Sequence, residues 1–420
     1  MLSGFKVISF NHFHAGPMAA QLLADMGADV IAVEPLDGAF HRNWAVANHF
    51  VAGQSVNLLT TGRNKRSLAL DMKSADGKAV ARRLVEGADV LMENFRPGAM
   101  ERLGLGHEQV RAFNPRIVYA SVSGYGASGP DRDLPGQDLL LQARSGFAAR
   151  TGRADGPPTP AGPVIVDQHA ASLLAMGILA ALLARERTGE GRRVEGSLLQ
   201  SAIDLQAESM TAWMNGARSA TSRGPHGLAS WCGSGPSGIH ATADGHLAIS
   251  MAAPADLAVA LDLPALAGFD TADSFAHSAE ITRLVAARLP DRTTAQWLPL
   301  LAARGIWHMP VQDYDQLRDD PQLAHLGVFI DAESVEGAPI TLLNHPLRYD
   351  GQAPAVRWAP QRLGQQTRDV LGELGYGDAA IDALIAARTV GEPPAARAAA
   401  APTAPVTPTA PLPPAAPASS

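Results

Sequence analysis

The residue with the clearest chemical potential is an aspartate between an apolar run and a long alanine-rich stretch. Asp167 follows Val164-Ile165-Val166 and precedes a helix predicted over 170–186. An aspartate in this position is typical of a helix N-cap, whose side chain accepts bonds from backbone N–H groups. A carboxylate at a helix start can also face a cavity and act as a nucleophile, with nearby N–H groups stabilising developing charge. The residues alone leave both interpretations open.

A glycine pattern offers a second kind of chemistry. Gly124-Tyr125-Gly126-Ala127-Ser128-Gly129 matches G-x-G-x-x-G and follows a predicted strand. A dinucleotide site also needs the last glycine to open a helix that holds the pyrophosphate. Residues 130–135 instead carry two prolines, and the first strand-to-helix turn, 11–16, has a single glycine. The pattern therefore indicates a turn near the carboxyl edge of a sheet, not an NAD site.

Four histidines near the N-terminus could suggest a metal. His12, His14, His41 and His49 lack a companion cysteine or a His-Glu-x-x-His arrangement, so we expect no metal site. His14 follows the first predicted strand, where open α/β sheets bind ligands, and is expected to line a pocket there.

Composition excludes several classes of protein. The chain has 420 residues and a formal charge of −7 without a basic stripe, which argues against a nucleic-acid partner. Its single cysteine, Cys232, excludes an internal disulfide. No charged segment followed by a long apolar one is seen at the N-terminus, and the apolar stretch 170–184 is too short to span a bilayer. We expect a cytoplasmic protein without a membrane partner.

The elements that must position these residues alternate between strand and helix. This alternation, with crossovers that imply parallel pairs, predicts a doubly wound, Rossmann-like α/β domain. The predicted strands cover 5–10, 29–33, 67–71, 89–92 and 117–122, and the predicted helices cover 18–26, 77–86, 100–103, 109–113, 138–141 and 170–186.

A smaller α+β domain is expected after residue 238. It opens with a hairpin whose turn is Asp244-Gly245. We assign 1–200 and 330–390 to the large domain, 201–238 to a linker with a glycine-rich loop, 239–329 to the small domain, and 391–420 to a disordered Ala/Pro tail.

Several segments in a fixed order extend these inferences, because together the chain resembles the family III CoA-transferases. This family contains formyl-CoA:oxalate and carnitine CoA-transferases and a related α-methylacyl-CoA racemase. The resemblance runs from about residue 4 to 390 and is carried by Ala15-Gly16-Pro17, residues 22–31, Asn64-Lys65-Arg66-Ser67, residues 93–98, Gln142-Ala143-Arg144-Ser145-Gly146 and residues 185–191.

The resemblance implies an acyl-CoA:carboxylate CoA-transferase in which Asp167 forms an aspartyl anhydride and then an aspartyl-CoA thioester. Such an enzyme takes an acyl-CoA and a carboxylic acid as substrates, uses CoA as a substrate and no other cofactor, and forms an interlocked homodimer. Gly233, Gly235 and Gly238 would belong to a loop over the active site. The CoA contacts implied are His14, Ala15, Arg42, Leu70, Lys73, Asn94, Phe95, Arg96, Arg102 and Gln137. Arg42 would replace an arginine that formyl-CoA transferase has where this chain has Pro35.

Two other functions are compatible with the resemblance. The racemase branch has Gly-His-Asp where this chain has Gly136-Gln137-Asp138, and a glutamine amide cannot exchange the α-proton. This difference favours CoA transfer, although His14 or His169 could replace the missing base. The third possibility is a non-catalytic CoA-binding protein, and the presence of Asp167 argues against it.

Overall fold

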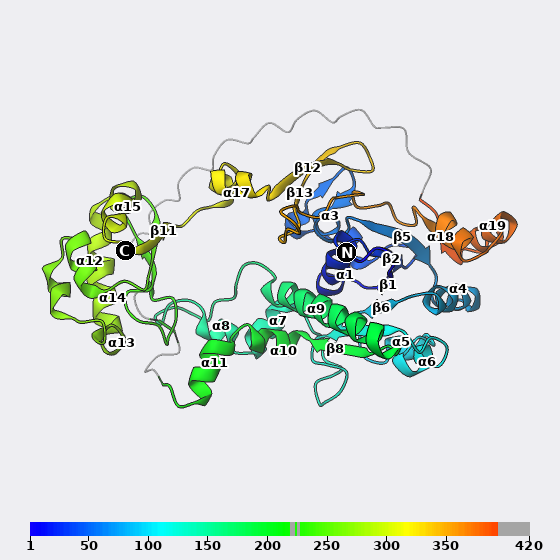
Figure 1. The fold of residues 1–420 in the computed structure, drawn as a ribbon, viewed down its shortest axis with the longest axis horizontal. Helices are drawn as coiled ribbons and strands as arrows, with labels where there is room; N and C mark the ends of the chain where they lie inside the picture. Colours follow the sequence, from blue (N-terminus) through cyan, green and yellow to red (C-terminus); the bar gives the residue numbers. More distant parts are fainter. Residues whose placement is uncertain (219–222, 225–226, 394–420) are drawn as a thin grey trace, which may run out of the picture.

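The computed structural model describes residues 1–218, 223–224 and 227–393 (Figure 1). Parts of the expected linker, 219–222 and 225–226, and most of the expected tail, 394–420, lie outside these residues. Gly391, the first residue of the expected tail, lies in strand β14 (Val390–Gly391). The tail was therefore predicted to begin too early, because the chain first returns to the central sheet and pairs with β5 (Lys65–Leu70).

A seven-stranded sheet of order β14-β5-β2-β1-β6-β7-β8 forms the centre of the larger part of the molecule. Neighbouring strands pair in parallel except for β14, which is antiparallel to β5. The chain winds outward from β1 in both directions, so the winding reverses between β1 and β6. At such a reversal the carboxyl ends of the strands form the crevice in which open α/β sheets bind ligands. The other strands are β1 (Lys6–Phe10), β2 (Asp29–Glu34), β6 (Val90–Glu93), β7 (Val118–Ser123) and β8 (Arg193–Ser197).

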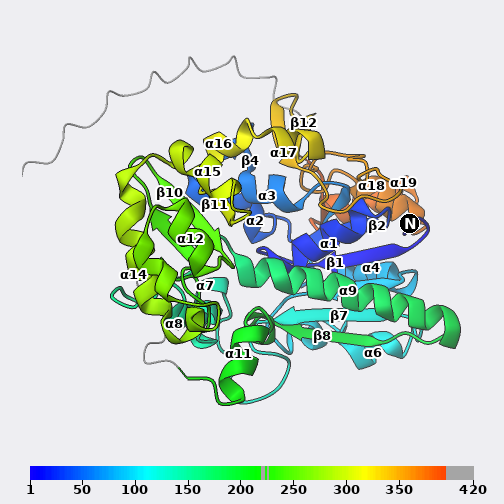
Figure 2. The same ribbon diagram turned by 60° about the vertical axis from the view of Figure 1, so that its left-hand side comes forward.

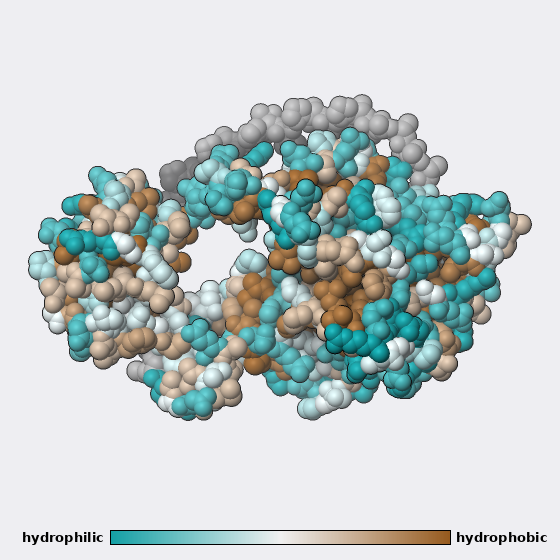
Figure 3. All heavy atoms as spheres, viewed as in Figure 1, coloured by the Kyte–Doolittle hydropathy of each residue, from teal (hydrophilic) through white to brown (hydrophobic). Residues whose placement is uncertain are grey.

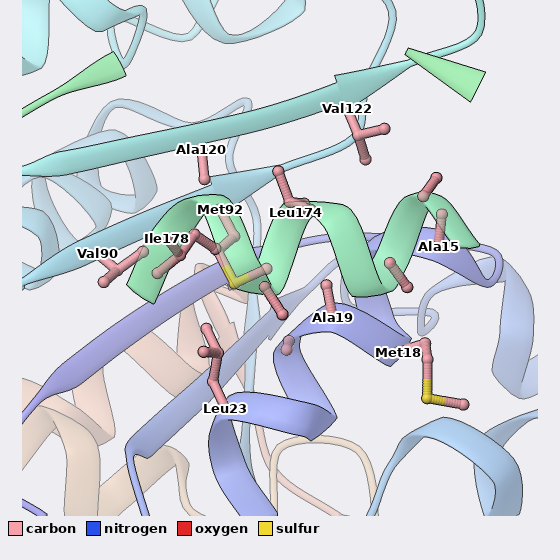
Figure 4. Packing of buried hydrophobic residues seen from close by; sticks show 14 of the residues in the cluster. Ala15, Met18, Ala19, Leu23, Val90, Met92, Ala120, Val122, Leu174 and Ile178 are labelled. Atoms are coloured by element: carbon pink, nitrogen blue, oxygen red, sulfur yellow. The ribbon is translucent and has the colours of Figure 1, made fainter. Parts of the chain in front are cut away.

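Both faces of this sheet are buried, and side chains alternate between two hydrophobic cores. In β1, Val7 packs into one core and Ile8 into the other, and Val90 and Leu91 of β6 divide in the same way. Figure 4 shows the first core, where Ala19 and Leu23 of one helix and Leu174 and Ile178 of another lie near strand residues such as Val90 and Met92. Strands covered on both sides read as continuous apolar runs, which explains why β1, β2, β6 and β7 were predicted close to their observed bounds. β5 begins two residues before its prediction, and β8 and β14 were not among the predicted strands.

Helices cover the two faces of the sheet (Figures 1 and 2). The first face carries α1 (Ala15–Asp25), α9 (Ile165–Thr188) and α10 (Leu198–Asp204), with α7 (Asp138–Arg144) beside them. The second face carries α4 (Ala75–Glu86), α5 (Ala99–Arg102), α6 (His107–Arg111), α18 (Thr367–Glu373) and α19 (Asp378–Ala386). Shorter elements of this part are α2 (Phe40–Asn43), η1 (Val46–Asn48), β3 (Phe50–Val51), β4 (Gln54–Ser55), α3 (Val56–Thr61) and α8 (Phe147–Arg150).

A separate hydrophobic core joins residues between 247 and 306. Its sheet has the order β11-β10-β9, and the antiparallel pair β9–β10 confirms the predicted hairpin with Asp244-Gly245 at its turn. The elements of this part are β9 (Gly238–Ala241), β10 (His246–Ser250), α12 (Pro254–Ala260), η3 (Pro264–Gly268), α13 (Asp273–Ala276), α14 (Ser278–Arg288), η4 (Leu289–Asp291), α15 (Thr294–Ala302) and β11 (Trp307–Pro310).

The chain leaves the larger part after α10 and returns after β11, so two connections join the parts. Figure 3 shows an open hole between them. The elements of the connections are α11 (Ala207–Met214), α16 (Tyr314–Arg318), α17 (Pro321–Leu326), and the hairpin of β12 (Phe329–Glu333) with β13 (Pro339–Leu343). The hairpin rests near α3 on the larger part.

The longest helix differs from its prediction. α9 begins five residues before the predicted start at 170 and has 24 residues. By length and composition alone it could cross a membrane, contrary to the prediction that the stretch is too short. It packs along α1, β7 and β8, however, as the core helix of a folded domain does.

Candidate active site

Asp167 lies in the first turn of α9 but does not cap it. The helix starts at Ile165, Val164 occupies the N-cap position, and Asp167 is the third helical residue. The N-cap interpretation of Asp167 is therefore wrong. Its side chain has no hydrogen-bonding or ion-pairing partner among the residues that the structure describes.

The cap comes from another helix. Asp138, the first residue of α7, accepts the backbone N–H groups of Val166 at 2.8 Å and of Asp167 at 2.9 Å through its Oδ2 atom. Its Oδ1 atom accepts a hydrogen bond from Nε2 of Gln142 at 2.5 Å, and Oε1 of Gln142 in turn accepts the N–H of Ala161 at 2.8 Å. Asp138 and Gln142 are each only 2% exposed.

This arrangement removes a role expected from the sequence. The N–H of Ile165 bonds to the oxygen of Pro163 at 2.9 Å, and the N–H of Gln168 bonds to the oxygen of Val164 at 3.1 Å. Together with the two bonds to Asp138, the first four N–H groups of α9 are occupied. The expectation that they stabilise charge developing near Asp167 is wrong for this conformation.

The surroundings of Asp167 disfavour its charged form. Burial, and then the nearby negative charge of Asp138, raises the pKa of the Asp167 carboxyl from 3.8 to about 7. A half-buried carboxylate without a partner and beside a like charge is poorly stabilised. Such a group is a candidate for nucleophilic chemistry, in which a perturbed pKa is expected.

His14 contacts the residue that follows Asp167. Its Nε2 atom is 3.1 Å from Oε1 of Gln168, the residue after Asp167. Burial lowers the pKa of His14, so the neutral ring is favoured. Ala15 begins α1 and is buried against α9. The packing of α1 on α9 therefore brings the expected contacts His14 and Ala15 to the helix that carries the expected nucleophile.

Asn94 joins the strand ends at the reversal of the sheet. Its Oδ1 atom accepts the N–H of His12 and its Nδ2 atom donates to the oxygen of His12, each at 2.8 Å. The ring centroids of His12 and Phe95 are 5.2 Å apart. Asn94 thus fixes the end of β6 to the end of β1, and Phe95 packs at the same place.

The remaining expected CoA contacts are more widely spread. Lys73, Arg96, Arg102 and Gln137 are exposed, and Gln137 immediately precedes α7. Leu70 as a whole is 1% exposed within the second core, so it offers no surface to a ligand in this conformation. Among the described residues, no hydrogen bond or ion pair joins the side chains of these residues to one another.

The guanidinium group of Arg42 is paired with a carboxylate inside the protein and is not free for a ligand phosphate. It holds the buried Glu34 through Nε–Oε2 and Nη2–Oε1 contacts of 2.5 and 2.6 Å, and it also donates to the oxygen of Gln361 at 2.9 Å. Although burial opposes ionisation, Arg42 lowers the pKa of Glu34 to about 2.

A small polar cavity lies beside this pair and was not predicted. Lys65 lines it and donates to the oxygen of Pro17 at 2.6 Å, and burial lowers the pKa of Lys65 to about 7. Nδ1 of His41 and Oδ1 of Asn11 are buried there without a partner among the described residues. Lys65 belongs to the Asn64–Ser67 segment, but no local pattern signals that its ammonium group points into the protein.

The expected glycine-rich loop lies on the smaller part of the molecule. A Cβ atom added to Gly235 would lie 2.6 Å from the oxygen of Ser278, and one added to Gly238 would lie 2.0 Å from the oxygen of Gly227. Both glycines allow close backbone packing, whereas Gly233 would meet Ser230 only at an ordinary 3.5 Å. Gly235 and Gly238 hold the loop against its own domain.

The G-x-G-x-x-G pattern has a packing role. Gly124 lies against Gly136, where a Cβ atom added to Gly136 would be 2.2 Å from the Cα atom of Gly124. No helix follows Gly129 before α7, as the sequence predicted. The close approach lets the backbone before Asp138 pass over the end of β7.

Sequence reasoning missed Asp138 and Gln142. Asp138 lies in the Gly136-Gln137-Asp138 segment, of which only Gln137 carries the argument against the racemase. Gln142 lies in a segment that contributes only to the family resemblance. Their spacing of four residues, which lets an Asp and a Gln pair on a helix, was the available signal. In the described part of the chain, no three His, Cys, Asp or Glu side chains are grouped for a metal.

Comparison with known proteins gives a consistent result. The family description CoA-transferase family III matches residues 2–367. A succinate–glutarate CoA-transferase of Agrobacterium fabrum is 31% identical over 396 residues, covering 89% of this chain and 95% of the relative. A succinyl-CoA–D-citramalate CoA-transferase of Chloroflexus aurantiacus is 33% identical over 386 residues, covering 89% and 94%. The crystal structure of a CAIB/BAIF family protein from Brucella suis superposes with a TM-score of 0.77 at 28% identity, covering 89% of this chain and 99% of that one.

Proposed function

The chain belongs to CoA-transferase family III and transfers CoA between an acyl-CoA and a carboxylate, and we propose that Asp167 is the nucleophile that carries the acyl group and then CoA. The observation that carries this proposal is the carboxylate of Asp167, which has no partner among the described residues and is held by its backbone in the first turn of α9, one residue before the Gln168 that contacts His14.

The reaction conserves the thioester in four steps. The Asp167 carboxylate attacks the donor thioester, which forms a mixed anhydride and releases CoA thiolate. The thiolate attacks the aspartyl carbonyl, giving an aspartyl-CoA thioester and the free donor acid. The acceptor carboxylate then attacks this thioester, forming a second anhydride and thiolate. Attack of the thiolate on the acceptor's carbonyl yields the new acyl-CoA and regenerates Asp167. Because each intermediate holds an activated acyl bond, neither water nor ATP is needed.

CoA is proposed to enter along the carboxyl edge of the sheet. Its thioester would lie at His14 and Ala15, with Asn94 and Phe95 beside them. The cationic groups expected for the nucleotide phosphates are exposed on the same part of the molecule. The further proposed contacts are Leu70, Lys73, Arg96, Arg102 and Gln137. Arg42 would act indirectly, by holding Glu34 at the end of β2.

Water must be kept from the two acyl intermediates, and we propose that the loop of Gly233, Gly235 and Gly238 contributes to this cover. Since Gly235 and Gly238 are packed within the smaller part, the loop would move with its domain.

We also propose that two chains interlock through the hole of Figure 3. The apolar side chains of Met176 and Leu183 on α9 are each 60% exposed and would be covered in such a dimer. The proposed protomer has a Rossmann-like large domain over 1–200 and 330–390, a linker over 201–238 and a small domain over 239–329. A cytoplasmic location is part of the same proposal.

The first experiment tests transfer and the nucleophile together. The protein is incubated with succinyl-CoA, chosen because relatives are named for it, and with a panel of carboxylic acids, and new acyl-CoAs are identified by mass. Hydroxylamine should trap an acyl group at Asp167 as a hydroxamate. Asp167→Ala should abolish exchange but keep CoA binding, and Asp133→Asn, on an exposed loop, should exchange normally. Full exchange by Asp167→Ala, or loss of an α-deuterium without CoA transfer, would show that the proposed reaction is wrong.

A further inference from the structure

The start of α9 is held by a side chain remote in sequence. A helix is normally capped by the residue directly before it, but Val164 has no side chain that can accept a hydrogen bond. Asp138 replaces that cap from 28 and 29 residues away, and one of its two bonds goes to the N–H of Asp167 itself. The backbone of the proposed nucleophile is therefore fixed by Asp138.

The same contacts keep the helix N-terminus from stabilising the Asp167 side chain. Free N–H groups in the first turn would stabilise a carboxylate there and weaken it as a nucleophile. Asp138 occupies two of them, and it places a second carboxylate beside Asp167. Conversion of Asp167 to an anhydride or a thioester removes its charge and with it the repulsion between the two aspartates. The arrangement therefore favours acylation over the free carboxylate.

We propose that Asp138 is a positioning residue for the CoA-transfer reaction, which orients Asp167 through its backbone and keeps its carboxylate reactive. This inference rests on the proposed role of Asp167 as nucleophile. Gln142 supports this role, because its bonds to Asp138 and to the backbone of Ala161 fix the rotamer of the Asp138 carboxylate.

Other titratable groups near Asp167 come from two further elements. His14 approaches from the start of α1 through Gln168. On α9 itself, His169 is paired with Asp204 at the end of α10, with Nε2 and Oδ2 2.7 Å apart. Asp138 is the charged group that acts on the pKa of Asp167 after burial.

The test compares the pH dependence of acyl-enzyme trapping by hydroxylamine in the wild type and in Asp138→Asn. The asparagine oxygen can still accept both N–H groups of α9, but its charge is gone. We expect the acidic limb of the profile to move to lower pH by about one unit, because the like charge is removed. The trapping rate at pH 8 should fall about tenfold, with the KM for acyl-CoA nearly unchanged.

A double variant separates charge from hydrogen bonding. In Asp138→Asn with Gln142→Glu, the new carboxylate accepts bonds from the asparagine amide and from the Ala161 N–H, so every bond is kept and the charge moves away. The double variant should regain wild-type stability and keep the shifted limb, and it also replaces the single variant if that one does not fold. Asp133→Asn removes an exposed charge as the matched control.

Two results would overturn the inference: an unmoved acidic limb in Asp138→Asn, or a wild-type limb in the double variant. Parallel measurements on Asp167→Ala separate the two proposals. If that variant still transfers CoA, the nucleophile itself is misassigned. If it is inactive while the limb of Asp138→Asn is unmoved, only the role of Asp138 fails.

Discussion

The contact between Gly124 and Gly136 allows a sharp test of how the fold positions the site. In Gly136→Ala the new Cβ atom would stand 2.2 Å from the Cα atom and 3.0 Å from the nitrogen of Gly124. Both neighbours are backbone atoms, so no side chain can rotate out of the way. To reach an ordinary contact of about 3.4 Å, one backbone segment must move by roughly 1.2 Å.

The expected loss of unfolding free energy in Gly136→Ala follows from the contacts that this backbone shift would break. Overpacking of this kind costs about 1–3 kcal/mol. Gly136 is two residues before Asp138, whose bonds to α9 are 2.8 and 2.9 Å long and would not survive a shift of that size. Loss of a helix cap costs about 1 kcal/mol more. We therefore expect Gly136→Ala to lose about 3 kcal/mol of unfolding free energy, together with most of its transferase activity.

Urea denaturation and initial rates of CoA exchange measure the two effects. Gly162→Ala is the matched control, because a Cβ atom there meets nothing within 4 Å and the residue lies in the loop before α9. The reasoning is refuted if Gly136→Ala unfolds within about 0.5 kcal/mol of the wild type and exchanges CoA at the normal rate.

Two further predictions concern stability. Because the pKa of Asp167 is raised to about 7 in the folded state, the folded protein binds more protons than the unfolded chain between pH 4 and 7 and loses stability as pH rises through this range. Asp167→Asn should therefore be more stable than the wild type by about 2 kcal/mol at pH 8, allowing for solvent screening, and equally stable near pH 4. Urea titrations at both pH values measure this, and a stability difference that does not change with pH would contradict the prediction. Arg63→Met leaves the carboxylate of Asp25 buried without its 2.6 Å partner and should cost about 3–5 kcal/mol, whereas Arg82→Met, which breaks an exposed pair with Glu86, should cost less than about 1 kcal/mol in the same assay.

The strands could be predicted because their signals are local. The segment predicted at 29–33 is β2 (Asp29–Glu34), and the one predicted at 117–122 is β7 (Val118–Ser123). A run of apolar residues buried on both faces needs no knowledge of its partners to be recognised. The hairpin at Asp244-Gly245 was equally local, since the turn residues themselves dictate the connection.

The function of the charged segment 63–67 could not be predicted in this way, because its partners are distant in sequence. Arg66 pairs with Asp29 and with Glu373, which is 307 residues away, and Asn64 accepts the N–H of Arg357 at 2.6 Å. These residues fasten the returning C-terminal segment to the sheet. Asn64 and Arg66 belong to the segment that carries the family resemblance, and in this structure their side chains hold distant parts of the chain together.

The start of α9 shows how a local rule can fail where a site is built. The sequence predicts an N-cap at Asp167, because an aspartate before a helical stretch normally is one, and it also predicts that the same residue is the nucleophile. The structure divides these roles between two aspartates. Asp138 satisfies the N–H groups of the first turn, so the helix extends back to Ile165 and carries Asp167 inside it. A capping carboxylate would be held by its own hydrogen bonds and turned toward the helix. Since Asp138 performs that task, the carboxylate of Asp167 has no internal partner to leave when it attacks a thioester.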